Sequence, residues 1–304
     1  MTGLELYTAT ARRASSTVIT AYSTSFGLSS RLLPPTMRGD IQTVYALVRV
    51  ADEIVDGPGA EAGLDLDGCR RVLDELEQEV ERAIETGFSA DLVVHAFAET
   101  ARRVGISRDQ TGPFFAAMRR DLEPVAFADE RELRRYVYGS AEVIGIMCVR
   151  CFLGGASLPD AEARRVARGA RALGSAFQIV NFLRDLGADA TSLGRAYLPG
   201  VDPAHPSEEA VGRVLDRLEG ELRIALGTVQ LLPRDARPAV IAAHDLFAAL
   251  ARRIRSTPAA ELPLRRISVP RSQQLAILAR AAVSVGVGRT AAAASRPLAA
   301  GVAR

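Results

Sequence analysis

Apolar residues recur three and four residues apart along almost the whole chain, and clusters of proline and glycine separate these stretches. This spacing places apolar side chains on one face of an α-helix, and the sequence lacks alternating β-branched runs bounded by hairpin turns. The pattern predicts helices at 4–21, 36–56, 65–86, 89–104, 108–121, 130–154, 160–189, 207–231, 234–255 and 270–286. We therefore expect an all-α, single-domain helical bundle over residues 1–290, followed by a frayed, alanine-rich tail at 291–304.

Helix boundaries are marked by capping residues. Ser107 with Gln110, and Asp129 with Glu132, have the spacing of capping boxes, in which two side chains bond reciprocally to free backbone N–H groups. The segment 65–86 alternates acidic and basic residues on one side, so we expect it to be a solvated outer helix.

Composition excludes several classes of protein. The 304 residues are 48% hydrophobic and 24% charged, which is the composition of a globular protein rather than a disordered one. The net charge of +2 is too balanced for a dedicated nucleic-acid surface, so we expect no nucleic-acid partner. Lysine is absent from the sequence, which excludes a P-loop lysine and Schiff-base chemistry. The positively charged side chains are therefore arginines, whose guanidinium groups bind carboxylates and phosphates well.

Cysteine usage and apolar run lengths indicate a cytoplasmic protein. The three cysteines are too few for a disulfide framework, and we expect Cys148 and Cys151 to be buried helical residues rather than zinc ligands or a redox pair. The first residues lack a basic stretch followed by an apolar one, so we expect no signal peptide. Charged residues interrupt each long apolar run before it reaches the roughly 20 residues that a membrane span needs.

Two segments, 44–56 and 176–189, are apolar around nearly their whole circumference, which is typical of helices buried on all sides. Each carries an aspartate pair at i and i+4, on one helix face: Asp52 with Asp56, and Asp185 with Asp189. A single pair of this kind usually lies on a solvent-exposed helix face. Here both pairs fall in apolar surroundings, where burying an unpaired carboxylate costs free energy. Both also fall in the last turn of a predicted helix, which the helix dipole disfavours. The sequence therefore predicts that cations are their partners.

Hard cations fit these ligands best. Near the pairs the available ligands are oxygens, and the three histidines (95, 205 and 244) are scattered, so we expect these to be structural or surface residues. A di-iron site is a poor fit without a Glu-x-x-His motif. Mg²⁺ prefers one or two carboxylates plus water and substrate phosphate, with Mn²⁺ as the alternative ion. Arg49, Arg184 and Arg195 lie beside the pairs and could hold phosphate oxygens, although Arg49 could equally form an intrahelical ion pair with Asp52.

Four segments resemble motifs of the squalene/phytoene synthase family. They are 22–34 with its S-x-S-F, 45–56 with the first aspartate pair, 136–147 with its Y-x-Y, and 178–199 with the second pair and a following R-A-Y-L-P. The match runs in the expected order from about residue 20 to 275. It implies the helical isoprenoid-synthase fold with a central apolar cavity.

The resemblance also implies an activity. It is the Mg²⁺-dependent, head-to-head condensation of two allylic prenyl diphosphates through a cyclopropylcarbinyl diphosphate, giving phytoene from two geranylgeranyl diphosphates in carotenoid biosynthesis. By carry-over, Asp52, Asp56, Asp185 and Asp189 bind metal; Ser23, Arg49, Gln178, Asn181, Arg195 and Tyr197 contact diphosphate or the reacting end; and Phe26, Tyr136, Ile144 and Gly145 line the cavity. Arg184 joins the substrate-binding set, and Tyr197 the catalytic one.

Alternatives remain open at this point. They are squalene synthesis from farnesyl diphosphate, which alone would need NADPH; release of presqualene diphosphate; a terpene synthase on the same fold; and a helical assembly factor, which would be expected to lose the aspartates. Four residues depart from the family pattern: Ser140, Glu142, Phe247 and Gln274. Lipid substrates make peripheral membrane contact an expectation, whereas the oligomeric state is left undetermined.

Overall fold

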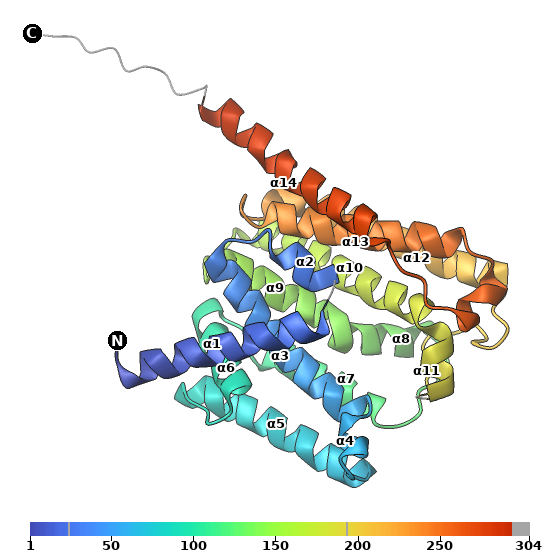
Figure 1. The fold of residues 1–304 in the computed structure, drawn as a ribbon, viewed down its shortest axis with the longest axis horizontal. Helices are drawn as coiled ribbons and strands as arrows, with labels where there is room; N and C mark the ends of the chain where they lie inside the picture. Colours follow the sequence, from blue (N-terminus) through green and yellow to red (C-terminus); the bar gives the residue numbers. More distant parts are fainter. Residues whose placement is uncertain (24, 193, 294–304) are drawn as a thin grey trace, which may run out of the picture.

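The computed structural model describes residues 1–23, 25–192 and 194–293, and their regular elements are all helical (Figure 1). The α-helices are α1 Gly3–Tyr22, α2 Ser25–Ser30, α3 Pro35–Val55, α4 Pro58–Glu61, α5 Leu66–Thr86, α6 Leu92–Val104, α7 Arg108–Asp121, α8 Glu130–Val137, α9 Val143–Leu153, α10 Asp160–Arg184, α11 Leu186–Ser192, α12 Glu208–Leu226, α13 Arg237–Arg255 and α14 Arg271–Ala293. Three short pieces complete them: the π-helix η1 Tyr138–Glu142 and the 3₁₀ helices η2 Val229–Leu231 and η3 Ala259–Leu264. The predicted frayed tail falls on residues outside this description, except that α14 continues to Ala293.

Helix α10 is the central element of the bundle. It packs against α9, η1, α12 and α13, while α5 and α14 lie at opposite edges of the molecule (Figure 1). Large apolar side chains of neighbouring helices, such as Phe97, Phe114 and Phe115, are fully buried in one contiguous core. Removing this apolar area from water is the main stabilising contribution to such a bundle. As expected, α5 is amphipathic and its charged face is solvated.

The capping predictions hold with one shift in register. Ser107 and Gln110 form the complete reciprocal box at the start of α7. The Asp129 side chain accepts from the N–H groups of Arg131 and Glu132, but the Glu132 carboxylate accepts from Ala128 rather than from Asp129. The second box therefore closes one residue earlier than predicted.

One continuous helical run, Glu130–Leu153, comprises α8, η1 and α9. By length and composition it could cross a membrane, despite the charged residues that interrupt its apolar stretch, and half of its most apolar window is buried inside the bundle. Such burial is typical of the core helix of a bundle.

The predicted helix 160–189 is in fact two helices. The α-helical hydrogen bonding breaks at Asp185, where φ is −103° and ψ is 12°, and α11 begins at Leu186. The bond from the Asp189 N–H to the Asp185 carbonyl, 2.9 Å, keeps the i, i+4 relation across the bend. Asp189 therefore lies in the first turn of α11, where a helix dipole favours a carboxylate. The expectation that Asp185 and Asp189 both lie in the last turn of one helix is therefore wrong for Asp189.

Candidate active site

A cavity of about 520 Å³ runs through the bundle beside α10. All the sequence-predicted site residues whose side chains are described line it: Ser23, Arg49, Asp52, Asp56, Tyr136, Ile144, Gly145, Gln178, Asn181, Arg184, Asp185, Asp189, Arg195 and Tyr197. Phe26 belongs to α2, and its side chain lies outside the described part of the structure. Residues from the two halves of the chain thus meet around one space.

The two ends of the cavity differ in chemistry. The aspartates lie where α3 and α10 end, whereas the far wall is apolar and includes Phe152, Val166 and Leu232. Asp185 and Val166 are 19 residues apart along α10, which corresponds to about 28 Å at 1.5 Å per residue. The cavity can therefore hold a long apolar chain that carries a polar head group.

Arginines already pair with some of the carboxylates. Arg195 donates to Asp56 at 2.7 Å, and Asp185 accepts from the Nε atoms of both Arg184, at 3.0 Å, and Arg266, at 2.8 Å. The predicted cationic partners of Asp56 and Asp185 thus include arginines, whereas the expectation that both helices are buried on all sides is wrong. Both helices face the cavity, so their acidic side chains are only half-buried.

Arg49 forms intrahelical ion pairs, as its spacing from Asp52 allowed. It lies 4.0 Å from Asp52, forms a closer ion pair with Glu53, and stacks over the Tyr22 ring at 4.6 Å. These contacts hold the guanidinium at the cavity wall, where it remains available to a phosphate.

The other two aspartates resist ionisation. Burial, followed by the neighbouring Asp56, raises the pKa of Asp52 well above its ordinary value. Burial and then Asp185 raise the pKa of Asp189 to about 7. For Asp185 itself, burial is outweighed by the bonds from Arg184 and Arg266, which lower its pKa. Carboxyls whose pKa is raised by burial and by each other are stabilised in their ionised form by a bound cation.

The donor set at this end fits a hard cation. Besides the carboxylates, the cavity lining includes Asn181, whose Oδ1 atom is buried without a hydrogen-bond partner. Within the described ranges, no three carboxylate, imidazole or thiol groups come close enough to hold an ion by themselves. A cation here would take its remaining ligands from water or from a bound diphosphate, as Mg²⁺ commonly does.

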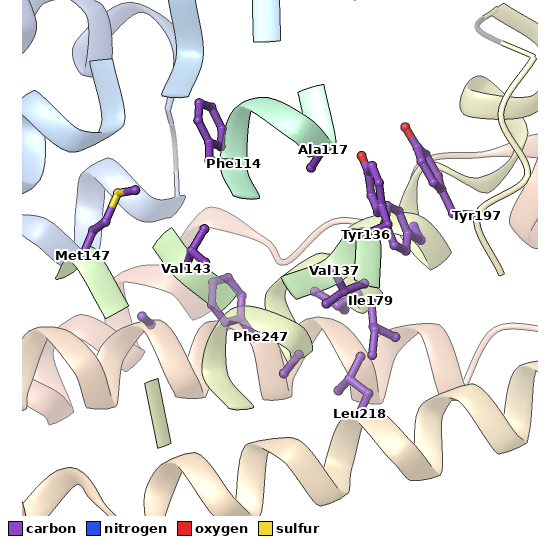
Figure 2. Close-up of a cluster of buried hydrophobic side chains, with 14 of the residues drawn as sticks. Phe114, Ala117, Tyr136, Val137, Val143, Met147, Ile179, Tyr197, Leu218 and Phe247 are labelled. Atoms are coloured by element: carbon purple, nitrogen blue, oxygen red, sulfur yellow. The ribbon is translucent and has the colours of Figure 1, made fainter. Parts of the chain in front are cut away.

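Sequence reasoning missed a buried cluster beside the carboxylates, centred on Asp121 at the end of α7. Its carboxylate accepts from the Tyr136 hydroxyl at 2.5 Å and the Tyr197 hydroxyl at 3.0 Å, and its carbonyl accepts from Arg195 at 2.8 Å. Burial raises the pKa of Asp121 to about 6, although Arg195 and the two phenols oppose that rise. The tyrosine rings stack with centroids 5.3 Å apart, and Figure 2 shows their hydroxyl oxygens at the same end.

The four departures from the family pattern fall in different places. Ser140 lines the cavity within η1, and its buried Oγ has no partner. Glu142 instead pairs with Arg171 at 2.6 Å and does not line the cavity, so it adds no acid there. Phe247 lines the cavity and packs on Phe177, with ring centroids 4.6 Å apart.

The remaining departure, Gln274, lies in α14. Its amide donates to the Val269 carbonyl at 2.8 Å, and it lines a second cavity rather than this one.

Cys151 is buried in α9 as expected, whereas Cys148 is only half-buried and lines the cavity. The histidines are structural or surface residues, as expected. Cys148 and Cys151 lie in α9 without a disulfide, and burial raises the pKa of Cys148 to about 12. His95 is buried beside the Thr8 hydroxyl at 2.9 Å, and His205 is exposed. None of the three histidines lines the reaction cavity.

Comparison with known proteins agrees with this geometry. The family described as squalene/phytoene synthase matches residues 19–273. Phytoene synthase 3 of Zea mays is 33% identical over 71% of this chain and 50% of its own length. The phytoene synthase of Rhodobacter capsulatus is 30% identical over 86% of this chain and 78% of its own. The chain spans about half the length of the plant relatives it matches.

Solved structures share the architecture. A dehydrosqualene synthase, crystallised with a ligand, superimposes with a TM-score of 0.73 at 19% identity, over 92% of this chain and 98% of that one. The squalene synthase HpnC from Alicyclobacillus acidocaldarius gives 0.69 at 20% identity, over 83% of this chain and 97% of that one. The predicted all-α isoprenoid-synthase fold is thereby confirmed. The chain belongs to the squalene/phytoene synthase family, whose members are prenyltransferases.

Proposed function

We propose that this protein condenses two allylic prenyl diphosphates head to head, and that it forms phytoene from two molecules of geranylgeranyl diphosphate. The observation that carries the proposal is the single cavity with four aspartates at one end and an apolar wall along the rest. The relatives named as phytoene synthases, at 30–33% identity, favour the twenty-carbon substrate.

At the polar end, the proposed roles follow from the contacts. The pair Asp52 and Asp56, and the pair Asp185 and Asp189 with the Asn181 oxygen, would hold Mg²⁺ together with water and diphosphate oxygens, since no three of the described acidic groups could do so alone. When bound, the ion would neutralise the charge that develops as pyrophosphate departs. Arg49, Arg184 and Arg266 surround the carboxylates and would bind the remaining diphosphate oxygens. Arg195, held between Asp56 and the Asp121 carbonyl, fixes the spacing between these two acidic residues.

Along the apolar wall, Ile144, Phe177 and their neighbours would enclose the hydrocarbon chain. They exclude water from the allylic cation that forms when the diphosphate leaves, so that the second substrate's double bond captures it instead. The phenols of Tyr136 and Tyr197, oriented by Asp121, would lie between the apolar chain and the carboxylates, where the bonds change.

Size is consistent with the substrate. An extended geranylgeranyl chain measures about 19 Å from ordinary bond lengths, which is shorter than the roughly 28 Å of α10 along the cavity. The fifteen-carbon farnesyl chain also fits, so size does not by itself separate phytoene from squalene synthesis.

The deciding experiment is product analysis. The protein is incubated with Mg²⁺ and geranylgeranyl diphosphate, and in parallel with farnesyl diphosphate with and without NADPH, and hydrocarbons are identified by mass spectrometry. We expect phytoene and pyrophosphate from the first mixture. Squalene or presqualene diphosphate would select the farnesyl reaction, and a cyclic product from one substrate would indicate a terpene synthase. Inactivity on every allylic diphosphate would refute the proposal.

A further inference from the structure

A second cavity, of about 410 Å³, lies against the reaction cavity beneath α2 and α14. Ser23 and Ser30 line both cavities, so the two spaces adjoin there. Arg38 lines the second cavity from α3, 14 residues before Asp52, which places it about 21 Å from the carboxylate end. That separation is close to the length of an extended twenty-carbon chain.

The lining of the second cavity is cationic. It contains Arg31, Arg38 and Arg271 and no acidic residue. In the described part of the chain, none of these arginines forms an ion pair with a carboxylate. Arg38 donates only to the backbone carbonyls of Arg31 and Leu33, and its buried Nε has no partner. Among the described residues, therefore, no carboxylate pairs with the positive charge at this cavity.

Apolar side chains accompany these cations. Leu275 lines the second cavity from α14 and is 62% exposed, and Val283, two turns later, is 64% exposed. Tyr22, at the end of α1 beside Ser23, is also exposed. Figure 1 shows the C-terminal half of α14 projecting beyond the bundle at its upper left.

Charge is distributed unevenly along the sequence. After Glu261 the chain contains seven arginines and no aspartate or glutamate, so the preceding 261 residues carry a net charge of −5 against +2 for the whole protein. An apolar and basic helix beside a basic cavity has the composition of a surface that binds anionic lipid.

We propose that the face formed by α2 and α14, with Arg31, Arg271, Leu275 and the exposed Arg280 of α14, docks on an anionic phospholipid bilayer. Docking would seat the opening of the second cavity against the bilayer. Prenyl chains would then pass between membrane and reaction cavity past Ser23 and Ser30. This last role rests on the proposed function, whereas the docking itself does not.

Vesicle sedimentation tests the docking. The full-length protein is mixed with vesicles of phosphatidylcholine alone, or with one third phosphatidylglycerol, at low and high salt. We expect binding to the anionic vesicles only, weakened by salt because screening shortens the range of the attraction. The triple variant Arg31→Gln/Arg271→Gln/Arg280→Gln should bind about a hundredfold more weakly, from about fivefold per basic residue. Leu275→Glu should also weaken binding.

The matched control removes three arginines from α5, at the opposite edge of the molecule: Arg70→Gln/Arg71→Gln/Arg82→Gln should bind vesicles as the wild type does. An Asp185→Asn variant should also bind normally, since vesicle binding needs no turnover, so failure of the enzymatic proposal would be recognised separately. The docking proposal is overturned if the wild type ignores anionic vesicles or if the two triple variants bind equally. It is also overturned if the face proves to join two copies, shown by a vesicle-free dimer that the first triple variant dissociates.

Discussion

Asp121 joins the two tyrosines to the acidic end of the cavity. Its carboxylate accepts hydrogen bonds from both tyrosine hydroxyls, and its backbone carbonyl accepts one from Arg195. Arg195 also donates to the Asp56 carboxylate. One side chain thus orients groups on α8 and on the segment after α11. We place Asp121 in the site as a positioning residue, because it acts through Tyr136, Tyr197 and Arg195.

Removing the Asp121 carboxylate should lower turnover by more than any loss of folded protein would account for. We expect Asp121→Ala to lower kcat by about a hundredfold, since both phenols lose the acceptor that fixes them. Asp109→Ala, at the exposed other end of α7, is the matched control and should leave kcat unchanged. In a double-mutant cycle, Asp121→Ala and Tyr197→Phe should be strongly non-additive. Additive effects, or activity within twofold of wild type, would contradict the positioning role.

Asp189 should make the metal-free protein less stable as pH rises. Its folded pKa of about 7 lies above the ordinary 3.8, so between these values the folded state binds a proton that the unfolded state has released. Stability contributed by that proton is present at low pH and is lost as pH rises through about 7. In EDTA, the melting temperature should therefore fall less steeply from about pH 5 to pH 7.5 in Asp189→Asn than in wild type.

The exposed Asp109→Asn is the control for this measurement and should keep the wild-type slope. Asp52 and Asp121 have pKa shifts of the same sign, so Asp189→Asn should flatten the slope without abolishing it. A slope identical in wild type and Asp189→Asn would show that Asp189 ionises normally.

The sequence predicts some of these residues and not others for a physical reason. The aspartate pairs are visible because a charge at i and i+4 contrasts with an otherwise apolar helix. Asp121 follows Arg119 and Arg120 and precedes Leu122, a pattern typical of a solvated helix end. Tyr136, Tyr197 and Arg195 contact Asp121 in its buried position, and these contacts from other segments are invisible in local sequence.

At the scale of elements, α10 packs closely against α9 and η1 because glycines at the crossings face neighbouring backbone. A Cβ on Gly145 would overlap the Ala170 carbonyl oxygen, and one on Gly174 would lie 2.5 Å from the Ala141 oxygen. Close approach leaves no space for a methyl group at either crossing. Gly145 thus shapes the cavity wall through helix packing as well as by lining it.

Adding a methyl group at this crossing should loosen the bundle. We expect Gly145→Ala to lower the free energy of unfolding by about 1–3 kcal/mol, the usual cost of overpacking. Gly212→Ala in α12 is the matched control: its Cβ would meet no atom within 4 Å, so it should raise stability by about 0.5–1 kcal/mol. Urea unfolding measures both. Equal effects from the two substitutions would rule out close packing at Gly145.

The existence of the long helices was predictable here, whereas the short helices α2 and α4 and the helix interruptions were not. Periodicity continues unbroken through Asp185, so local sequence favours one helix from 160 to 189. The break coincides with contacts from a segment about eighty residues later: Arg266 binds the Asp185 carboxylate, and Gly187 lies against the Pro263 carbonyl. The π-helical η1 likewise falls within a run whose period predicts an ordinary helix.

At the scale of the whole molecule, the site is assembled from both halves of the chain. The first aspartate pair ends α3, the second spans α10 and α11, and Arg195 bonds to Asp56 across 139 residues. No part of the chain contains the polar end by itself. Ligand binding should therefore stabilise the entire bundle rather than one segment, because a ligand shifts the unfolding equilibrium of every element that contacts it.

Metal and substrate analogue should stabilise the protein only in combination. We expect geranylgeranyl thiodiphosphate with Mg²⁺, at about 100 times its Kd, to raise the melting temperature by about 5 °C, from about 2.7 kcal/mol of binding free energy. Either component alone should give much less, because the carboxylates supply too few ligands without the diphosphate and repel it without the metal. Asp52→Asn should reduce the combined shift, whereas Asp109→Asn should preserve it. A full shift in EDTA would mean that the arginines bind the diphosphate unaided, and the metal would then have no role in binding.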